Sequence, residues 1–191
     1  MSRRHLLVAA LLACAGITAA NATIVTVNTD GSWNQFDVTR DLALDGGLGW
    51  IDINDGSALS FQFTVAAGSF VKLTVVDTGF AGDRFSVSLN GNALANTSAA
   101  VNSYPTAIGQ ADFDVALANP DYSRGIYQLG EGTYTVTGSL FSSALDGTGA
   151  AIDATSGGLS VAAVPLPAAA WLLMSGMGAL GLRLRRRSQT V

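Results

Sequence analysis

The sequence predicts an all-β protein: an antiparallel β-sandwich of the jelly-roll or immunoglobulin-like kind, flanked by an N-terminal signal peptide and a single C-terminal transmembrane helix. Three observations predict this. Apolar and polar residues alternate over short runs in the middle of the chain, with Gly-containing turns between them. Both ends of the chain are apolar and basic, whereas the middle is acidic. About 140 residues separate the two ends, which is enough for one domain with a sizeable core.

The first 22 residues have the pattern of a secretory signal peptide. A basic start is followed by the apolar stretch Leu6–Ile17 and then by a small-x-small cleavage signal at Ala20 and Ala22. The mature chain is therefore expected to begin at Thr23. One alternative stays open, because the residues that end at Cys14 resemble a lipoprotein box in which this cysteine would carry a lipid.

Strict alternation predicts the strands of the body, residues 23–163, because alternate side chains of a strand point to opposite faces of a sheet. Pairs such as Asn90-Gly91 supply the tight turns between strands. A last strand at Leu159–Ala163 would leave only a short linker before the C-terminal segment. The residues expected to face the core are Val25 and Val27, then Phe61, Phe63 and Val65, Val71, Leu73 and Val75, Phe85, Val87 and Leu89, Phe113, Val115 and Leu117, and finally Tyr134 and Val136.

Two irregular stretches, residues 96–110 and 119–125, are the predicted surface loops. They carry Tyr104 and Tyr122, and the body also contains Trp33 and Trp50. An exposed aromatic ring is a platform on which a sugar can stack, and the same ring can fill a core or fix a loop to it. We expect these four rings mainly to pack against the sandwich, with ligand stacking as the alternative.

The body is strongly acidic. All 14 acidic residues of the chain lie within it, against four basic residues, so its net charge is −10. Nucleic acids and anionic lipid surfaces bind proteins largely through Lys and Arg, so this charge argues against both as partners. Cations, neutral sugars and basic proteins remain compatible with it.

The body contains neither His nor Cys, because His5 and Cys14 both lie in the signal peptide. This excludes Ser-His-Asp and Cys-His catalysis, the usual zinc sites and disulfides. Two carboxylates suffice for glycoside hydrolysis, but no pair is singled out, since most Asp residues adjoin Gly or Asn in predicted turns. We therefore expect no enzymatic activity and no obligatory cofactor.

Calcium is the more serious metal candidate, because Ca²⁺ takes only oxygen ligands and extracellular sites are often rich in carboxylates. The stretch from Asp52 to Gly56 invites comparison with an EF-hand loop, but it lacks the spacing and the closing Glu. We expect solvated carboxylates in turns, with calcium binding at one end of the sandwich as the alternative. The candidate ligands are Asp41, Asp45, Asp52 and Asp55.

The last 28 residues consist of three parts. Val164-Pro165-Leu166-Pro167 is held extended by its prolines. Residues 168–182 are apolar and would form a helix of roughly 22 Å, so flanking residues must help it to span a membrane core of about 30 Å. The third part is basic, and such a cluster is retained on the cytoplasmic side. It comprises Arg183, Arg185, Arg186 and Arg187.

This arrangement resembles the PEP-CTERM sorting signal, which exported proteins of Gram-negative bacteria carry and which a membrane enzyme called an exosortase processes. The usual Val-Pro-Glu-Pro motif is matched at Val164, Pro165 and Pro167, with Leu166 in place of Glu. The resemblance implies cleavage at or near Pro165 to Pro167.

A second, shorter resemblance lies in the body. The stretch Val75–Asn90 is similar to one in the bodies of some PEP-CTERM proteins, and this implies a shared sandwich without implying any chemistry. Physically the stretch predicts a strand, a turn and a second strand. Arg84 is placed where it could pair with an acid near that turn.

These patterns together predict an exported, non-enzymatic surface or extracellular-matrix protein. It would be anchored transiently in the inner membrane, processed by an exosortase, and then associated with exopolysaccharide in a biofilm. Two alternatives remain open. One is a secreted carbohydrate-binding module, with or without calcium. The other is a membrane protein that keeps its C-terminal anchor permanently.

Overall fold

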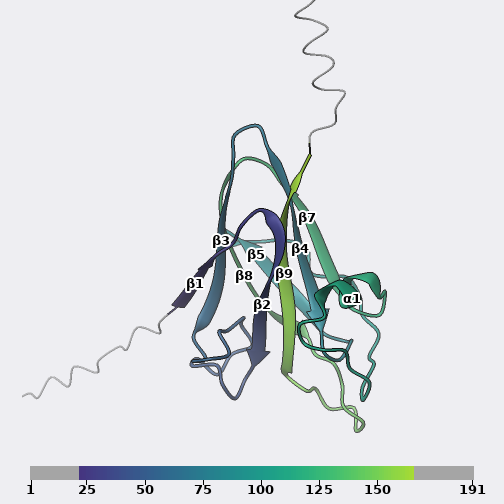
Figure 1. The fold of residues 1–191 in the computed structure, drawn as a ribbon. Coiled ribbons are helices and arrows are strands. Elements are labelled where there is room, and N and C mark those ends of the chain that lie inside the picture. The colour runs from purple at the N-terminus through teal and green to yellow at the C-terminus, as the bar shows by residue number, and fades with distance from the viewer. Residues whose placement is uncertain (1–21, 166–191) are drawn as a thin grey trace, which may run out of the picture.

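The computed structural model describes residues 22–165, which form two facing β-sheets and one short helix (Figure 1). Within this range no helix is long and apolar enough to cross a membrane. Several predicted features lie outside the described residues: the signal peptide up to residue 21 with Ala20 and Cys14, the motif residues Leu166 and Pro167, the apolar run 168–182, and the cluster Arg183, Arg185, Arg186 and Arg187.

The first sheet contains five strands in the order β1-β3-β8-β5-β6. β1 runs parallel to β3, and the other neighbours are antiparallel. The predicted turn at Asn90-Gly91 joins β5 to β6, and both residues have the positive φ that a tight hairpin needs. The strands are β1 (Ala22–Thr26), β3 (Ala58–Val65), β5 (Arg84–Leu89), β6 (Asn92–Ala93) and β8 (Gly132–Ser142).

The second sheet contains four antiparallel strands in the order β2-β9-β4-β7. The last strand of the chain, β9, is an inner strand that pairs with β2 on one side and β4 on the other. The predicted final strand is thus confirmed and is longer than expected. The strands are β2 (Asp30–Thr39), β4 (Phe70–Thr78), β7 (Arg124–Leu129) and β9 (Ala154–Val164).

Two consecutive glycines explain why the first part of β9 is a strand despite its small, polar composition. Gly157 lies against the ring of Phe36, and a Cβ atom built there would overlap that ring. Gly158 lies against the ring of Phe113 in the same way, on the opposite face of the sheet. The missing side chains let one aromatic ring approach the strand from each side.

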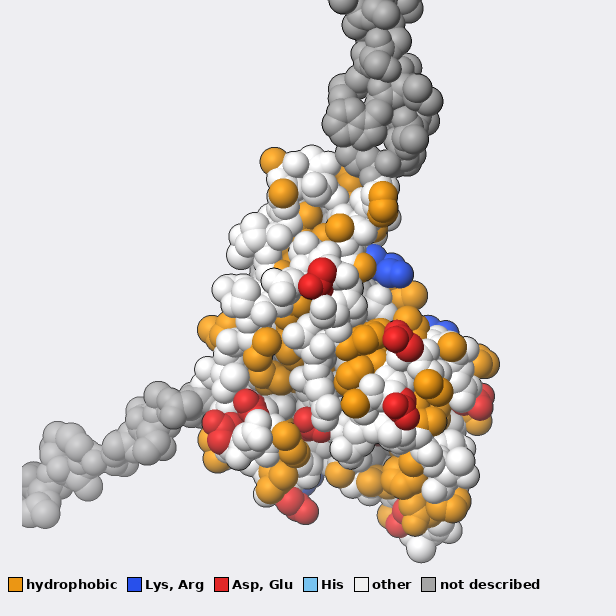
Figure 2. Space-filling model, in the orientation of Figure 1, with side chains coloured by type: hydrophobic (Ala, Val, Ile, Leu, Met, Phe, Trp, Pro, Cys, Tyr) orange, Lys and Arg blue, Asp and Glu red, His pale blue; other side chains and the backbone are white. Residues whose placement is uncertain are grey.

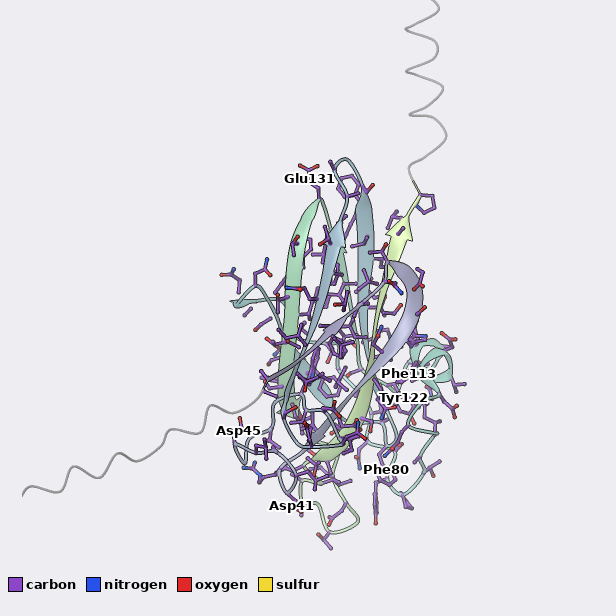
Figure 3. The ribbon with its side chains drawn as sticks, turned by 60° about the vertical axis from the view of Figure 1, so that its left-hand side comes forward. Asp41, Asp45, Phe80, Phe113, Tyr122 and Glu131 are labelled. Carbon is purple, nitrogen blue, oxygen red and sulfur yellow. The ribbon has the colours of Figure 1, made fainter. Side chains whose placement is uncertain are left out.

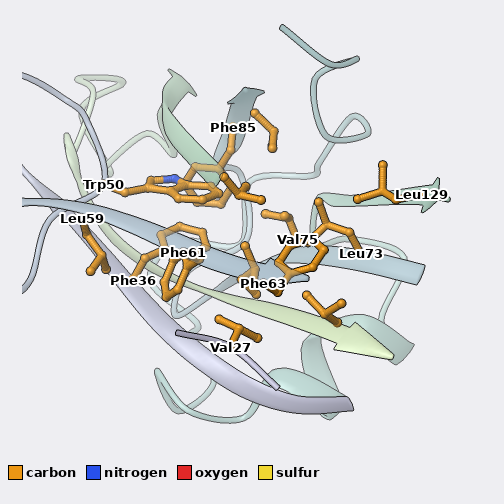
Figure 4. Close-up of a cluster of buried hydrophobic side chains, with 14 of the residues drawn as sticks. Val27, Phe36, Trp50, Leu59, Phe61, Phe63, Leu73, Val75, Phe85 and Leu129 are labelled. Atoms are coloured by element: carbon orange, nitrogen blue, oxygen red, sulfur yellow. The ribbon is translucent and has the colours of Figure 1, made fainter. Parts of the chain in front are cut away.

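Aromatic side chains fill the core between the sheets (Figure 4). Trp50 is buried, with its ring stacked on Phe36 at 4.0 Å between centroids, and Phe85 meets Phe36 edge-on at 5.0 Å. Trp50 comes from the segment between β2 and β3, where Ile51 pairs with Asp37 of the edge strand β2. This segment therefore closes one side of the sandwich. Other core residues are Val27, Leu59, Phe61, Phe63, Leu73, Val75 and Leu129.

The strand predicted at residues 113–117 is wrong, because this segment forms helix α1 (Phe113–Ala118). Phe113 and Ala116 are buried in a second cluster with Val76, on the outer face of the second sheet. Val115, which a strand would turn inward, is 55 % exposed. An apolar run this short fits the period of a helix as well as that of a strand, so its contact with the sheet decides the outcome.

Two turns close one end of the sandwich. Residues 66–69 join β3 to β4 and residues 130–131 join β7 to β8, and each turn crosses from one sheet to the other. β9 leaves the domain at this same end (Figure 1). We call residues 66–70, 130–131 and 164–165 the tip. Glu131 lies there, whereas Asp41 and Asp45 lie at the opposite end (Figure 3).

Candidate functional site

The C-terminal junction follows the last strand without a spacer. Val164, predicted as the first residue of the tail, is the last residue of β9 and pairs with Phe70 of β4. The N–H of Ala163 donates a hydrogen bond of 3.0 Å to the carbonyl oxygen of Thr29. Pro165 comes next, and it has no N–H with which to continue the ladder. Strand β9 therefore ends directly before the first proline of the motif.

A groove crosses the edge strand β2 at Asp37. A cavity of about 310 Å³ lies on one side of this residue, against β1, β3 and residues 51–54, and a second of about 250 Å³ lies on the other side, against β9. Asp37 and Ile53 line both cavities. Val25 and Leu59 give the first cavity an apolar wall.

The position of Asp37 is fixed by hydrogen bonds. The Nε2 of Gln35 donates to its two carboxylate oxygens at 3.2 and 3.3 Å, and the Oγ of Ser156 also donates to it. Asp37 is only 7 % exposed. The rest of the polar lining comprises Asp52, Asn54, Thr39, Gln110 and Thr155, without a Lys or Arg side chain.

This lining combines carboxylates, side-chain amides and hydroxyls with one apolar wall. Such groups both donate hydrogen bonds to hydroxyls and accept them, and an apolar wall suits the C–H face of a sugar ring. The groove is therefore chemically suited to a neutral, hydroxyl-rich ligand. Sequence pattern alone does not single out Asp37, because Ser156 and most of the groove lining come from distant parts of the chain.

A buried pair of carboxyl groups lies between the sheets at the end opposite the tip. Asp77 is fully buried, its Oδ1 accepts a hydrogen bond of 3.4 Å from the Oγ1 of Thr155, and its Oδ2 has no partner. Burial, with repulsion from Asp83, raises the pKa of Asp77 to about 9. Burial also raises the pKa of Asp83 to about 6, although the Ala144 N–H donates to its carboxylate at 2.8 Å. Asp77 is therefore mainly protonated at neutral pH.

The predicted aromatic residues lie in separate places. Trp50 and Tyr122 are only 1 % and 3 % exposed. The alternative that these two rings form a ligand platform is therefore wrong, because both are buried packing groups. Trp33 is half-buried against Phe113, and its Nε1 donates a hydrogen bond of 2.9 Å to Asp114. Tyr104 is 40 % exposed, and its ring lies 5.1 Å from that of Phe80 between centroids. Trp33 and Tyr104 thus each pack against a neighbouring ring while remaining partly exposed.

Three of the four candidate calcium ligands form turns. The carboxylates of Asp45, Asp52 and Asp55 each accept a hydrogen bond from the backbone N–H two residues later. The fourth candidate, Asp41, lies in the turn that follows β2. Within residues 22–165, no three His, Cys, Asp or Glu side chains gather in a way that could hold a metal ion.

Arg84 has partners other than the acid expected near its turn. Its Nε donates to the carbonyl oxygen of Ser98 at 3.0 Å, and its guanidinium lies 5.1 Å from the centroid of the Phe141 ring. In the described part of the chain the one ion pair joins Arg40 to Asp153 at 3.4 Å. Arg84 therefore ties residues 97–98 to β5 through backbone carbonyls.

Comparison with known proteins finds a likeness to solved structures alone. No protein-family model matches the chain, and no curated protein matches it significantly. Several solved structures match it, and two of them are each 11 % identical to it. One is the pre-peptidase C-terminal domain of a Bacillus anthracis collagenase, with a TM-score of 0.38 over 75 % of this chain and 96 % of that one. The other is CorA, a surface-associated copper-binding protein of Methylomicrobium album BG8, with a TM-score of 0.40 over 77 % of this chain and 100 % of that one. Both scores are low, and neither likeness bears on the function of this chain.

Proposed function

We propose that this chain is an exported, non-enzymatic surface or extracellular-matrix protein, which an exosortase processes at or near Pro165 to Pro167. The observation that carries the proposal is the direct passage from β9 into the proline motif. Val164, the first residue of the motif, is still paired with Phe70, so the last described strand leads directly into the motif. A cut there would release the whole sandwich.

The order of the other segments supports the same route. A signal peptide directs residues 23–163 out of the cytoplasm, and the apolar run 168–182 with its arginines stops transfer. The domain is thereby held outside the inner membrane until it is processed, and it then associates with exopolysaccharide. The catalytic residues of the cleavage belong to the exosortase, and this chain acts as its substrate.

The test is to identify both termini of the protein by mass spectrometry, after it is recovered from cells that carry an exosortase. We expect an N-terminus at Thr23 and a C-terminus between Pro165 and Pro167. The double variant Pro165→Ala/Pro167→Ala should accumulate with its tail intact. Pro120→Ala, which alters a proline in a distant loop, should be processed like the wild type.

Recovery of the intact C-terminus at Val191 would instead identify the tail as a permanent anchor and would overturn the proposal. The same result would leave the β-sandwich and its groove unaffected, because neither depends on the fate of the tail.

The groove at Asp37 supports a second candidate function, binding of a neutral carbohydrate. Its amides and carboxylates converge on two adjoining cavities. We expect Gln35→Ala to weaken binding of the purified protein to exopolysaccharide. Gln128→Ala, an exposed amide on β7, should not. Equal binding by both variants would remove this candidate. Trp50→Ala is not an informative test, because it would disrupt the core.

A further inference from the structure

We propose that the tip is a membrane-facing surface, which rests on the lipid bilayer while the chain is tethered. Phe70 and Val164 would contact the interfacial region of the bilayer. The inference depends on the proposed function in one respect, namely that the apolar run 168–182 lies in the membrane. It does not depend on whether an exosortase cuts the tail.

Exposed apolar side chains gather at the tip. Phe70 is 42 % exposed and Val164 is 39 % exposed, and the two residues pair directly across the ladder between β4 and β9. Ala66 and Ala67 of the neighbouring turn are exposed as well. Figure 2 shows hydrophobic side chains at this end of the domain. Aromatic and aliphatic side chains of this kind favour the boundary between headgroups and acyl chains.

The length of the chain beyond the tip keeps it near the membrane. From Val164 to Ala168, where the apolar run starts, there are four peptide steps. Fully extended, these steps span at most about 14 Å. The polar layer on one side of a bilayer is roughly 5 to 8 Å thick. The tip is therefore held within reach of the lipid surface at every orientation of the domain.

The distribution of charge selects the orientation. Asp41 and Asp45 lie at the end opposite the tip (Figure 3), and most carboxylates visible in Figure 2 lie away from it. The tip has one acidic residue, Glu131, whose carboxylate accepts a hydrogen bond of 2.9 Å from the Gly68 N–H. Anionic lipid repels the acidic end, so the sandwich stands with its apolar tip toward the bilayer.

A second copy of the chain fits this surface less well. Stable protein interfaces bury roughly 800 Å² on each partner. Two partly exposed side chains and two alanines provide far less than this. A lipid surface needs no shape complementarity, and it is already close to the tip.

The absence of Cys from the body allows a direct test. Phe70→Cys, in a Cys14→Ser background, is labelled with an environment-sensitive fluorophore, and the full chain is reconstituted in vesicles of phosphatidylcholine and phosphatidylglycerol. The matched control is Val115→Cys on helix α1, which is 55 % exposed but lies away from the tip. We expect blue-shifted emission and several-fold slower quenching by aqueous iodide at residue 70 only.

Equal access of iodide to residues 70 and 115 would overturn the proposal. If Phe70→Cys fails to fold, Ala67→Cys in the adjacent turn gives the same readout. The C-terminus of the same sample, identified by mass spectrometry, shows whether the chain was processed. The lipid contact and the proposed function are therefore tested separately. A protected probe on a chain that keeps Val191 supports the lipid contact without exosortase processing. An accessible probe on a chain that is normally processed removes the lipid contact alone.

Discussion

Replacing Asp77 by Asn is expected to remove most of the pH dependence of stability above pH 6. In the folded protein burial raises the pKa of Asp77 to about 9, and that of Asp83 to about 6. In the unfolded chain both carboxyls return to about 3.9. Below that value both states are protonated, so burial causes no loss of stability through ionisation.

As the pH rises above about 4, the unfolded chain releases these protons while the folded protein retains them. Each retained proton lowers the free energy of unfolding by about 1.4 kcal/mol per pH unit. The contribution of Asp83 ends near pH 6, whereas that of Asp77 continues to about pH 9. By pH 7 Asp77 alone lowers the stability by about 4 kcal/mol relative to pH 4.

The assay is urea unfolding, followed by the fluorescence of the buried Trp50, at intervals between pH 6 and 8.5. The body has no His to titrate in this window, so the slope belongs to Asp77. We expect a slope of about −1.4 kcal/mol per pH unit in the wild type and a slope near zero in Asp77→Asn. Asp121→Asn, a change at an exposed acid, should keep the wild-type slope. A wild type without a slope, or an Asn variant that retains it, would refute the reasoning.

Two further substitutions are tested by urea unfolding, one for the packing of the core and one for a buried hydrogen bond. Gly157→Ala should lower the free energy of unfolding by about 1 to 3 kcal/mol, because the added Cβ overlaps the ring of Phe36. The control is Gly130→Ala, whose Cβ would meet only the Phe70 ring at 3.8 Å. It should change the free energy of unfolding by less than about 0.5 kcal/mol. Similar losses in both variants would contradict this account. Thr97→Val should cost about 1 to 3 kcal/mol, because the buried Oγ1 accepts a hydrogen bond of 2.8 Å from the Phe85 N–H; an unchanged stability would show that this N–H finds another partner.

Alternation predicted strands β1, β3, β4, β5 and β8, whereas no strand was predicted at β2 or β7. In β3, Phe61 and Phe63 are buried while Gln62 is exposed, so the pattern of the sequence matches the burial. The prediction failed at α1, where six residues are too few to separate a period of 2 from one of 3.6. The start of β9 was missed for another reason. Its two glycines carry no side chain that could show a pattern, and the rings that cover them come from distant segments.

The candidate sites were harder to predict, because the chain brings their members together across long separations. The partners of Asp37 in the groove include Ser156, which lies 119 residues further along the chain. Asp77 does leave one signal in the sequence. It occupies the next inward position after Val71, Leu73 and Val75 of β4, and this spacing places a carboxyl in the core. The Gly that follows soon after made a turn the more obvious interpretation.

The central position of β9 has a consequence for the timing of folding. A chain that emerges from its N-terminus presents β2 and β4 early, but these strands have no common partner until residues 154–164 arrive between them. The second sheet can therefore close only after nearly the whole body is available for folding. On the proposed export route, closure would coincide with the arrival of the apolar run at the membrane. Because the ladder between β4 and β9 runs up to Val164, completion of the fold also brings the start of the motif to a fixed place on the finished domain.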